Sequence, residues 1–444
     1  MEKNYDVIIV GGGVVGTATM YAMSRYSNFK DVLLLEKEKD VALLNSNSNN
    51  NSQTLHSGEI ETNYSIEKTK ETKENAQLIV KYAEKELEPD ERPNIIQQCQ
   101  KMALAVGDEE VEKLEKRYDS DFKEIFPYVK KIDKKDELEK VEPNIIKGRD
   151  PNQKLLALFT ENGYMVDYHN LSKSFLDKAL LKEGYNALFQ TEVKDIKKTP
   201  EGYIISAKNK KFTARSVLVT AGAYSLYFAK NLGYGMDFGV LSVGGKFYYS
   251  KKVLNGKVYR VEREGIPFAA VHGDPDITNP DITRFGPTVN IYPELEKGNL
   301  KSMPDYLKSL NLDLDTIESL EKILFDETIS KIVRENFVYS IPSIGKIYFT
   351  RNEVNKIVPS LKPNDLKLAE NVGGIRPQII DTKKKQLALG GTAIEGDGAL
   401  FSVTPSPGAT SCLKEAMDNC LYLADYTENE FYLEDFKKYF EYKL

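Results

Sequence analysis

A glycine-rich turn near the amino end of the 444-residue chain could bind the phosphates of a dinucleotide. Gly11, Gly13 and Gly16 form a G-x-G-x-x-G pattern, and Glu36 follows 20 residues after the last glycine. The first glycine permits a tight turn, the second lets the backbone approach a pyrophosphate, and the third lets a helix pack closely on a strand. An acid at this distance accepts hydrogen bonds from ribose hydroxyls. The pattern predicts a dinucleotide site, whereas a glycine-rich turn in an unrelated α/β fold is the structural alternative.

Three histidines, His56, His169 and His272, narrow the search for a general base, because histidine is the side chain that ordinarily titrates near neutral pH. His272 stands two residues before Asp274, whose carboxylate could orient the imidazole and support its protonated form. His56 lies in a polar segment, residues 51–65, that is richer in possible contacts than a linker requires. His169 stands beside an expected helix start and is interpreted as structural. A structural role also stays open for His56 and His272.

The elements that must position these residues follow from the apolar patterns. Residues 6–10 are a β-branched run typical of a strand buried on both faces, and a helix over 14–26 and a strand over 32–35 complete a βαβ unit. The amino end of that helix offers free N–H groups to phosphates. Further along, the patterns predict helices over 65–87, 108–128 and 167–184, strands near 101–107, 191–196, 203–207, 216–220 and 386–389, a helical region near 303–337, and a helix beginning near 411.

Composition excludes several classes of protein. The chain has 61 basic and 67 acidic residues, a net charge of −6, and 41% hydrophobic residues, so a disordered polyelectrolyte is excluded and a nucleic-acid binder is disfavoured. The 3 cysteines are too few for a disulfide scaffold or for the thiolates of an ordinary iron–sulfur cluster, and no metal site is predicted. No apolar stretch approaches the ~20 residues that span a bilayer. We expect a protein of a reducing compartment that is soluble or attached to a membrane surface.

Four stretches of the chain resemble the malate:quinone oxidoreductase family, within the D-amino-acid-oxidase superfamily of FAD-dependent oxidoreductases. They are SQTLHSGEIETNY (52–64), PFAAVHGDPD with TRFGPT (267–276 and 283–288), GGIRPQ (373–378) and TPSPGATSCL (404–413). The resemblance covers nearly the whole chain and is nearest to the shorter branch of the family, found in some epsilonproteobacteria and apicomplexan parasites. One departure is Leu55, where longer members carry glycine immediately before the histidine.

The resemblance implies an α/β chain, α+β overall, with a Rossmann-like FAD-binding domain and an interleaved mixed-sheet substrate domain. Residues 1–95, 150–230 and 366–444 are assigned to the FAD-binding domain, and residues 96–149 and 231–365 to the substrate domain. Besides the glycine turn and Glu36, the implied FAD contacts are Val193, Ala221 and Gly222 at the adenine and pyrophosphate end, and Pro407, Gly408 and Ala409 in the carboxyl-terminal loop. A helix beginning after that loop would direct its positive end at the flavin pyrimidine ring.

The implied reaction is oxidation of (S)-malate to oxaloacetate, with hydride passing from C2 to flavin N5 and electrons then passing to a membrane quinone. Two carboxylates require two cationic clamps, and Arg376 and Arg284 are the candidates because a guanidinium binds a carboxylate through two parallel hydrogen bonds. His272 with Asp274 is the expected base, and His56 is expected to contact flavin or a substrate carboxylate, although which histidine is the base stays open.

Other outcomes remain open at this point. The chain could be another FAD-dependent 2-hydroxy-acid or amino-acid oxidase or dehydrogenase, for instance one acting on 2-hydroxyglutarate, or a non-catalytic flavin-bound interaction subunit. Oxygen could replace quinone as acceptor. The aromatic segment 431–440, with two lysines, could lie at a membrane interface or could dock a terminal helix on its own domain. The expected location is the cytoplasm at the inner face of the cell membrane, or the mitochondrion in a eukaryote.

Overall fold

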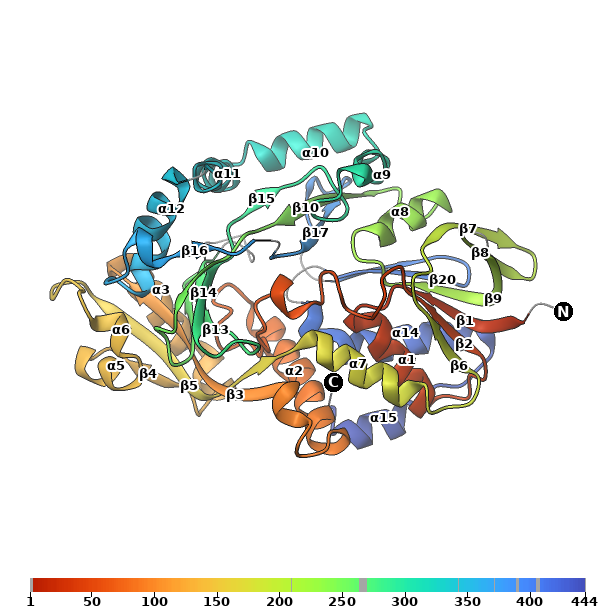
Figure 1. The fold of residues 1–444 in the computed structure, drawn as a ribbon, viewed down its shortest axis with the longest axis horizontal. Helices are drawn as coiled ribbons and strands as arrows, with labels where there is room; N and C mark the ends of the chain where they lie inside the picture. The colour runs from red at the N-terminus through yellow and green to blue at the C-terminus, as the bar shows by residue number, and fades with distance from the viewer. Residues whose placement is uncertain are drawn as a thin grey trace.

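Three β-sheets organise the described residues of this computed structural model, which are 3–208, 210–262, 270–341, 343–370, 372–388, 391–404 and 408–443 (Figure 1). The first sheet, at the right of the view, has the strand order β19-β20-β9-β1-β2-β6, and β8 and then β7 extend from β9. Its strands are β1 (Asn4–Val10), β2 (Val32–Leu35), β6 (Tyr185–Leu188), β7 (Val193–Thr199), β8 (Gly202–Ala207), β9 (Lys210–Val219), β19 (Thr392–Glu395) and β20 (Ala399–Val403).

The centre of this sheet is parallel, as the βαβ prediction requires. β1 pairs in parallel with β2 and with β9, β2 with β6, and β9 with β20. The residues of β2 are all buried, which explains their unbroken apolar run. Helix α1 (Val14–Tyr26) connects β1 to β2 and begins directly after the glycine turn. The predicted Rossmann-like unit is therefore present, and the α/β class with mixed sheets is confirmed.

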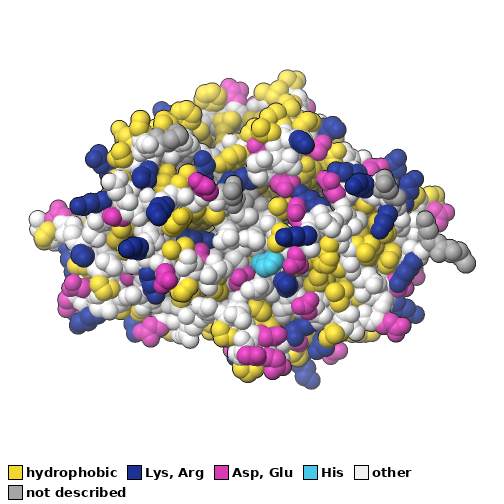
Figure 2. Space-filling model, in the orientation of Figure 1, with side chains coloured by type: hydrophobic (Ala, Val, Ile, Leu, Met, Phe, Trp, Pro, Cys, Tyr) yellow, Lys and Arg dark blue, Asp and Glu magenta, His cyan; other side chains and the backbone are white. Residues whose placement is uncertain are grey.

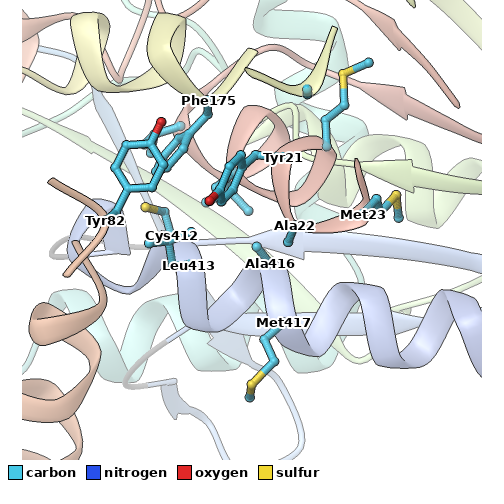
Figure 3. Packing of buried hydrophobic residues seen from close by; sticks show 14 of the residues in the cluster. Tyr21, Ala22, Met23, Tyr82, Phe175, Cys412, Leu413, Ala416 and Met417 are labelled. Atoms are coloured by element: carbon cyan, nitrogen blue, oxygen red, sulfur yellow. The ribbon is translucent and has the colours of Figure 1, made fainter. Parts of the chain in front are cut away.

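One face of this sheet is covered by helices from distant parts of the chain. α7 (Tyr168–Ala179) and α14 (Cys412–Thr427) pack against α1, and α2 (Ile66–Glu86) packs against α14. Their shared core includes Tyr21, Tyr82 and Phe175, whose rings meet, and Leu413 and Ala416 of α14 (Figure 3). Burial of these large apolar surfaces fixes the carboxyl-terminal helix beside the first βαβ unit.

The other two sheets lie toward the left and top of Figure 1. One contains β15 (Asn290–Ile291), β10 (Phe238–Gly244), β17 (Ile375–Asp381) and β18 (Gln386–Leu387), in that order. The larger contains β16 (Lys367–Leu368), β11 (Tyr248–Lys251), β14 (Ile282–Gly286), β13 (His272–Pro275), β12 (Lys257–Arg260), β3 (Ile96–Val106), β5 (Leu155–Val166) and β4 (Lys130–Ile132), in that order. The strands of each come from segments far apart in the sequence.

Most of the elements that the patterns predict lie where expected, and two differ instructively. The helix expected over 108–128 ends early, since α3 spans Asp108–Arg117 and Ser120 has an extended backbone before the short α4 (Lys123–Ile125). β5 and β17 pair with strands that the sequence division assigns mainly to the substrate domain, although their residues fall in stretches assigned to the FAD-binding domain. The domain division stays a prediction.

The remaining helices lie at the periphery. Small helices α5 (Lys135–Val141) and α6 (Pro143–Ile146) flank the larger sheet, and α8 (Tyr224–Asn231) follows β9. Four consecutive helices cover the upper edge in Figure 1: α9 (Met303–Leu310), α10 (Leu314–Leu324), α11 (Glu327–Tyr339) and α12 (Ile344–Phe349), and α13 (Asn355–Ile357) follows them. None of the helices in the described ranges combines the length and apolarity needed to cross a bilayer.

The aromatic carboxyl-terminal segment docks on its own domain. It forms α15 (Leu433–Phe440), in which Phe436 and Phe440 are buried and pack against Tyr26 of α1. Of the two interpretations of this segment, docking of a terminal helix is the one that the structure has. The apolar face of α15 is therefore used inside the molecule.

Candidate active site

A cavity of about 890 Å³ is lined by residues of the glycine turn, of the carboxyl-terminal loop and of strands β12, β13 and β17. Its lining includes Glu36, Val193, Gly11, Gly13 and Arg376, with several other residues named below. A cavity of this volume can hold a cofactor together with a small substrate. Most of the residues predicted for FAD line it.

The three positions of the turn that carry glycine require it for different structural reasons. Gly11 has a φ of +108°, and a Cβ atom on Gly16 would lie 2.1 Å from the Gly11 carbonyl oxygen, so both glycines are required by the turn and by helix packing. At Gly13 a Cβ would meet only Ser46 Oγ, at 3.4 Å. The fold itself leaves open space in front of Gly13, at the amino end of α1 where an anion is favoured. This space fits a pyrophosphate.

Glu36 directly follows β2 and lines the cavity, and it is the residue predicted to contact a ribose. The Gly12 N–H donates to Glu36 Oε2 at 2.6 Å, and the Glu38 N–H donates to Oε1 at 2.8 Å. Burial raises the pKa of Glu36, and these two backbone N–H groups oppose that rise. The carboxylate is thus held in one orientation toward the cavity, as recognition of ribose hydroxyls requires. Ala221 and Gly222, which follow β9, also line this region.

The carboxyl-terminal loop also lines the cavity. Gly408 and Ala409 line it at the first turn before α14, and a Cβ atom on Gly408 would lie 1.8 Å from Thr404 Cγ2. Thr404 is itself tied down, because its hydroxyl donates to Glu415 at 2.7 Å. Pro407, the third predicted residue of this loop, lies outside the described residues. The amino end of α14 therefore begins at the cavity, as predicted for a group that stabilises negative charge.

His272 and Asp274 form a tight buried pair on β13. His272 Nδ1 lies 2.5 Å from Asp274 Oδ2, and Asp274 Oδ1 accepts a hydrogen bond from the buried Lys257 ammonium at 3.2 Å. Burial raises the pKa of Asp274, but the positive charges of His272 and Lys257 outweigh it and lower the value to about 2. Burial lowers the pKa of His272 against the opposing effect of Asp274. His272 lines the cavity and Asp274 lies behind it.

His56 forms a second histidine–carboxylate pair at the same end of the cavity. Its Nδ1 lies 2.5 Å from Glu61 Oε1, and its backbone N–H donates to Thr410 Oγ1 at 3.1 Å. Burial raises the pKa of Glu61, but contact with His56 outweighs this and lowers it. Tyr259 of β12 separates the two pairs, with its ring stacked on His272 at 4.3 Å and edge-on to His56 at 6.0 Å. His169 does not line the cavity.

Three cations surround the end of the cavity near His272. Arg376 of β17 lines the cavity, burial lowers its pKa to about 10, and within the described ranges its guanidinium has no carboxylate partner. Lys246 also lines the cavity, between β10 and β11, and its ammonium is likewise unpaired among the described residues. Lys297 donates to the carbonyls of Gly245 and Val372, and burial, Lys246 and Arg376 lower its pKa to about 8. Uncompensated positive charge at a cavity wall attracts an anion.

Arg284 is the second predicted carboxylate clamp. It is buried at β14 and is absent from the cavity wall. Its Nη1 lies 3.3 Å from Asp276 Oδ2 and donates to the Ser48 carbonyl, its Nη2 donates to the Asn51 carbonyl at 2.5 Å, and its guanidinium lies over the Phe247 ring at 4.8 Å. These contacts involve both terminal nitrogens of the guanidinium, while Nε has no hydrogen-bond partner among the described residues, and the role of Arg284 as a carboxylate clamp stays a prediction. Through these hydrogen bonds Arg284 joins the 48–51 loop to strand β14.

Four residues of the site were missed by the sequence reasoning. Glu61 lies within the SGEIETNY stretch, so its place five residues after His56 was an available signal. Lys246, Tyr259 and Lys257 stand in no motif and reach the site only through strand pairing. Their roles depend on contacts between segments distant in sequence.

Comparison with known proteins finds relatives that cover nearly the whole chain. The family model "Malate:quinone oxidoreductase" matches residues 3–431. A probable malate:quinone oxidoreductase of Campylobacter jejuni is 40% identical over 443 residues, covering 97% of each chain. The malate:quinone oxidoreductase of Helicobacter pylori is 40% identical over 451 residues, covering 99% of this chain and 98% of the relative.

A solved structure shares the fold at lower identity. The dithionite-reduced L-α-glycerophosphate oxidase of Mycoplasma pneumoniae, with FAD bound, superimposes with a TM-score of 0.65 at 19% identity and covers 95% of both chains. The fold is thus that of FAD-containing oxidoreductases, with a Rossmann-like part and an interleaved substrate part. Together with the family match over nearly the whole length, these findings show that the chain belongs to the malate:quinone oxidoreductase family of flavoprotein oxidoreductases.

Proposed function

We propose that this chain oxidises (S)-malate to oxaloacetate and passes the electrons to a quinone. The observation that carries the proposal is that Arg376 and Lys246, which have no carboxylate partner among the described residues, line the same cavity as His272 of the His272–Asp274 pair. A dicarboxylic hydroxy acid needs these three functions together, namely two carboxylate clamps and a base. Membership of the malate:quinone oxidoreductase family supports this choice of substrate.

The cofactor is FAD. Glu36, Val193 and Ala221–Gly222 would hold its adenosine half, the turn through Gly11 and Gly13 its pyrophosphate, and Gly408 and Ala409 the pyrimidine side of the flavin. The open space at Gly13 and the start of two helices at the cavity fit this group. When bound, FAD would supply an acceptor for the hydride of C2 and a carrier from which two electrons can pass to the quinone.

The chain's own residues supply binding and proton transfer. Arg376 binds one malate carboxylate through two parallel hydrogen bonds, and Lys246 binds the other as a point charge. With Nδ1 of His272 held at Asp274, Nε2 is the ring nitrogen left to take the proton of the C2 hydroxyl. Asp274, which stays charged, then stabilises the protonated imidazole.

His272 is preferred to His56 as the base because its carboxylate partner is more firmly held. Asp274 has no exposed surface and a cationic partner in Lys257, and burial keeps His272 in the uncharged form that a base requires. We assign His56 to contact with the flavin or a substrate carboxylate. Single-turnover reduction of the bound flavin by malate separates the two, because His272→Gln should abolish it and His56→Gln should slow it. The reverse order of effects would assign the base to His56.

We also propose that a membrane surface lies against helices α9–α12, through which the quinone is reached. Each of these helices exposes apolar side chains at helical spacing, among them Leu307 of α9, Leu314 (84% exposed) and Ile317 of α10, and Phe337 of α11, while Phe325 between α10 and α11 is 79% exposed. Figure 2 shows hydrophobic side chains gathered along this upper edge. Exposed apolar patches of this kind favour contact with lipid or protein.

Flotation with phospholipid vesicles tests this surface. Replacing Leu314 and Phe325 together with aspartate should abolish co-flotation while leaving reduction of bound flavin by malate unchanged. Unaltered flotation of the double variant would remove α9–α12 from the proposal. The division into a FAD-binding domain (1–95, 150–230, 366–444) and a substrate domain (96–149, 231–365) is retained as part of the proposal.

A further inference from the structure

Two lysines are completely buried beneath the proposed active site. Lys257 and Lys101 each have no exposed surface, and they are register partners on the adjacent strands β12 and β3. A buried ammonium is costly to hold unless it is paired and hydrogen-bonded. Each of these two neighbouring ammonium groups must therefore be stabilised by its contacts, and the contacts of the two lysines differ.

Lys257 joins the two segments that carry the histidines. Its Nζ lies 3.2 Å from Asp274 Oδ1 and donates to the Ser52 carbonyl at 2.9 Å. Because Lys257 occupies Oδ1, the other oxygen of Asp274 is the one that meets His272, at 2.5 Å. Ser52 in turn starts the segment that ends in His56, and Ser52 Oγ lies 3.4 Å from His56 Nε2. The Lys257 ammonium thus holds the carboxylate of the His272–Asp274 pair and also binds the backbone of the segment that leads to His56.

The charged and titratable groups around His272 come from five strands. Asp274 lies on the same strand, Lys257 and Tyr259 on β12, Arg376 on β17, and Arg284 on β14, from where its charge acts on Asp274. The fifth strand, β3, contributes the partly buried Cys99 thiol, whose pKa burial raises, so that it stays uncharged. Among these groups, Lys257 and Arg376 oppose protonation of His272 and Asp274 favours it.

We propose that Lys257 is a positioning residue of the malate reaction, which holds Asp274 in a fixed orientation and keeps His272 uncharged until the substrate delivers its proton. Lys257 is not among the residues that line the cavity, and it acts through Asp274. The inference rests on the proposed role of His272 as the base. In this arrangement the buried Lys257 ammonium balances the negative charge of Asp274. Without that balance, Asp274 would favour protonation of the His272 imidazole.

Lys101 provides a matched control. It is equally buried, has the same side chain and sits at the paired position on the neighbouring strand. Its Nζ, however, contacts Glu59 Oε2 at 2.8 Å and Ser57 Oγ at 3.0 Å rather than Asp274. Replacing either lysine with methionine removes one buried charge and preserves most of the side-chain volume. Effects on His272 that follow from general loss of packing should therefore appear in both variants.

The experiment is a pH titration of the FAD-loaded protein labelled with ¹⁵N-histidine, followed by NMR. The chain has 3 histidines, so the signal of His272 is assigned by its loss in His272→Gln. In Lys257→Met the titration midpoint of His272 should rise by about one pH unit or more, because a neighbouring positive charge is removed. In Lys101→Met it should stay within about 0.3 unit of the parent. The acid limb of flavin reduction by malate should move to higher pH in Lys257→Met only.

Equal midpoints in the two lysine variants would overturn the proposal, and so would a fall of the midpoint in Lys257→Met. If Lys257→Met fails to fold, Lys257→Gln replaces it, since glutamine can still donate to Ser52 without carrying a charge, and the same upward shift is expected. The base assignment is tested separately, because normal flavin reduction in His272→Gln would end the proposed role of His272 while leaving the measured shift intact.

Discussion

Replacement of Arg376 with methionine separates a substrate clamp from a structural cation. Methionine keeps most of the side-chain volume and removes the charge and the parallel hydrogen bonds to a carboxylate. Hydrogen bonds to charged groups contribute about 1.5–3 kcal/mol each, so loss of the two bonds of this clamp should cost at least about 3 kcal/mol of malate binding. Since about 1.4 kcal/mol corresponds to tenfold, KM for malate should rise about 100-fold or more.

The stability of the same variant carries the second half of the prediction. Arg376 has no carboxylate partner among the described residues, so its removal leaves no protein charge unpaired, and the melting temperature should stay the same or rise. Arg284→Met is the matched control, because it strips the buried Asp276 of its cation and should cost about 3–5 kcal/mol of stability.

The assay is steady-state oxidation of malate with a soluble quinone analogue, together with thermal unfolding of the FAD-loaded protein. It is run at alkaline pH, because removal of Arg376 also raises the pKa of His272. A KM within about threefold of the parent, which corresponds to less than 1 kcal/mol, would refute the clamp. A loss of stability equal to that of Arg284→Met would instead assign Arg376 a structural role.

Three further predictions address the base, the second clamp and the cofactor turn. His272→Gln should retain bound FAD but lose its anaerobic reduction by malate, and a normal stopped-flow rate would discard the base. Lys246→Met should raise KM for malate about tenfold or more while leaving a monocarboxylic hydroxy acid unaffected, and equal losses for both acids would contradict the second clamp. Gly13→Ala should fold and bind FAD weakly, whereas Gly16→Ala should fail to fold, because its Cβ would lie 2.1 Å from the Gly11 carbonyl oxygen. Isothermal titration with FAD measures the binding, and circular dichroism measures the folding. Equal behaviour of the two variants would contradict the prediction.

Local patterns predicted the βαβ unit that carries the expected cofactor residues, because its determinants are close in sequence. The glycine turn, the helix over 14–26 and Glu36 all lie within one βαβ unit, and the structure has them at the predicted bounds. The pairing of His272 with Asp274 was also predictable, because alternate residues of a strand share a face.

The substrate half was less predictable, because its determinants are contacts between distant segments. Arg284 and Arg376 both stand in family-like motifs, yet β14 turns Arg284 toward Ser48 and Asn51 whereas β17 places Arg376 on the cavity wall. Nothing in the sequence around Lys246 distinguishes it from the many surface lysines of the chain. Its place follows from the pairing of β10 with β17, which no local pattern specifies.

The most direct measurement is the visible spectrum of the purified protein before and after anaerobic addition of (S)-malate. We expect a flavin spectrum that bleaches with malate, does not bleach with (R)-malate, and recovers when a quinone is added. A flavin that stays oxidised with malate while another 2-hydroxy acid bleaches it would contradict the proposed function.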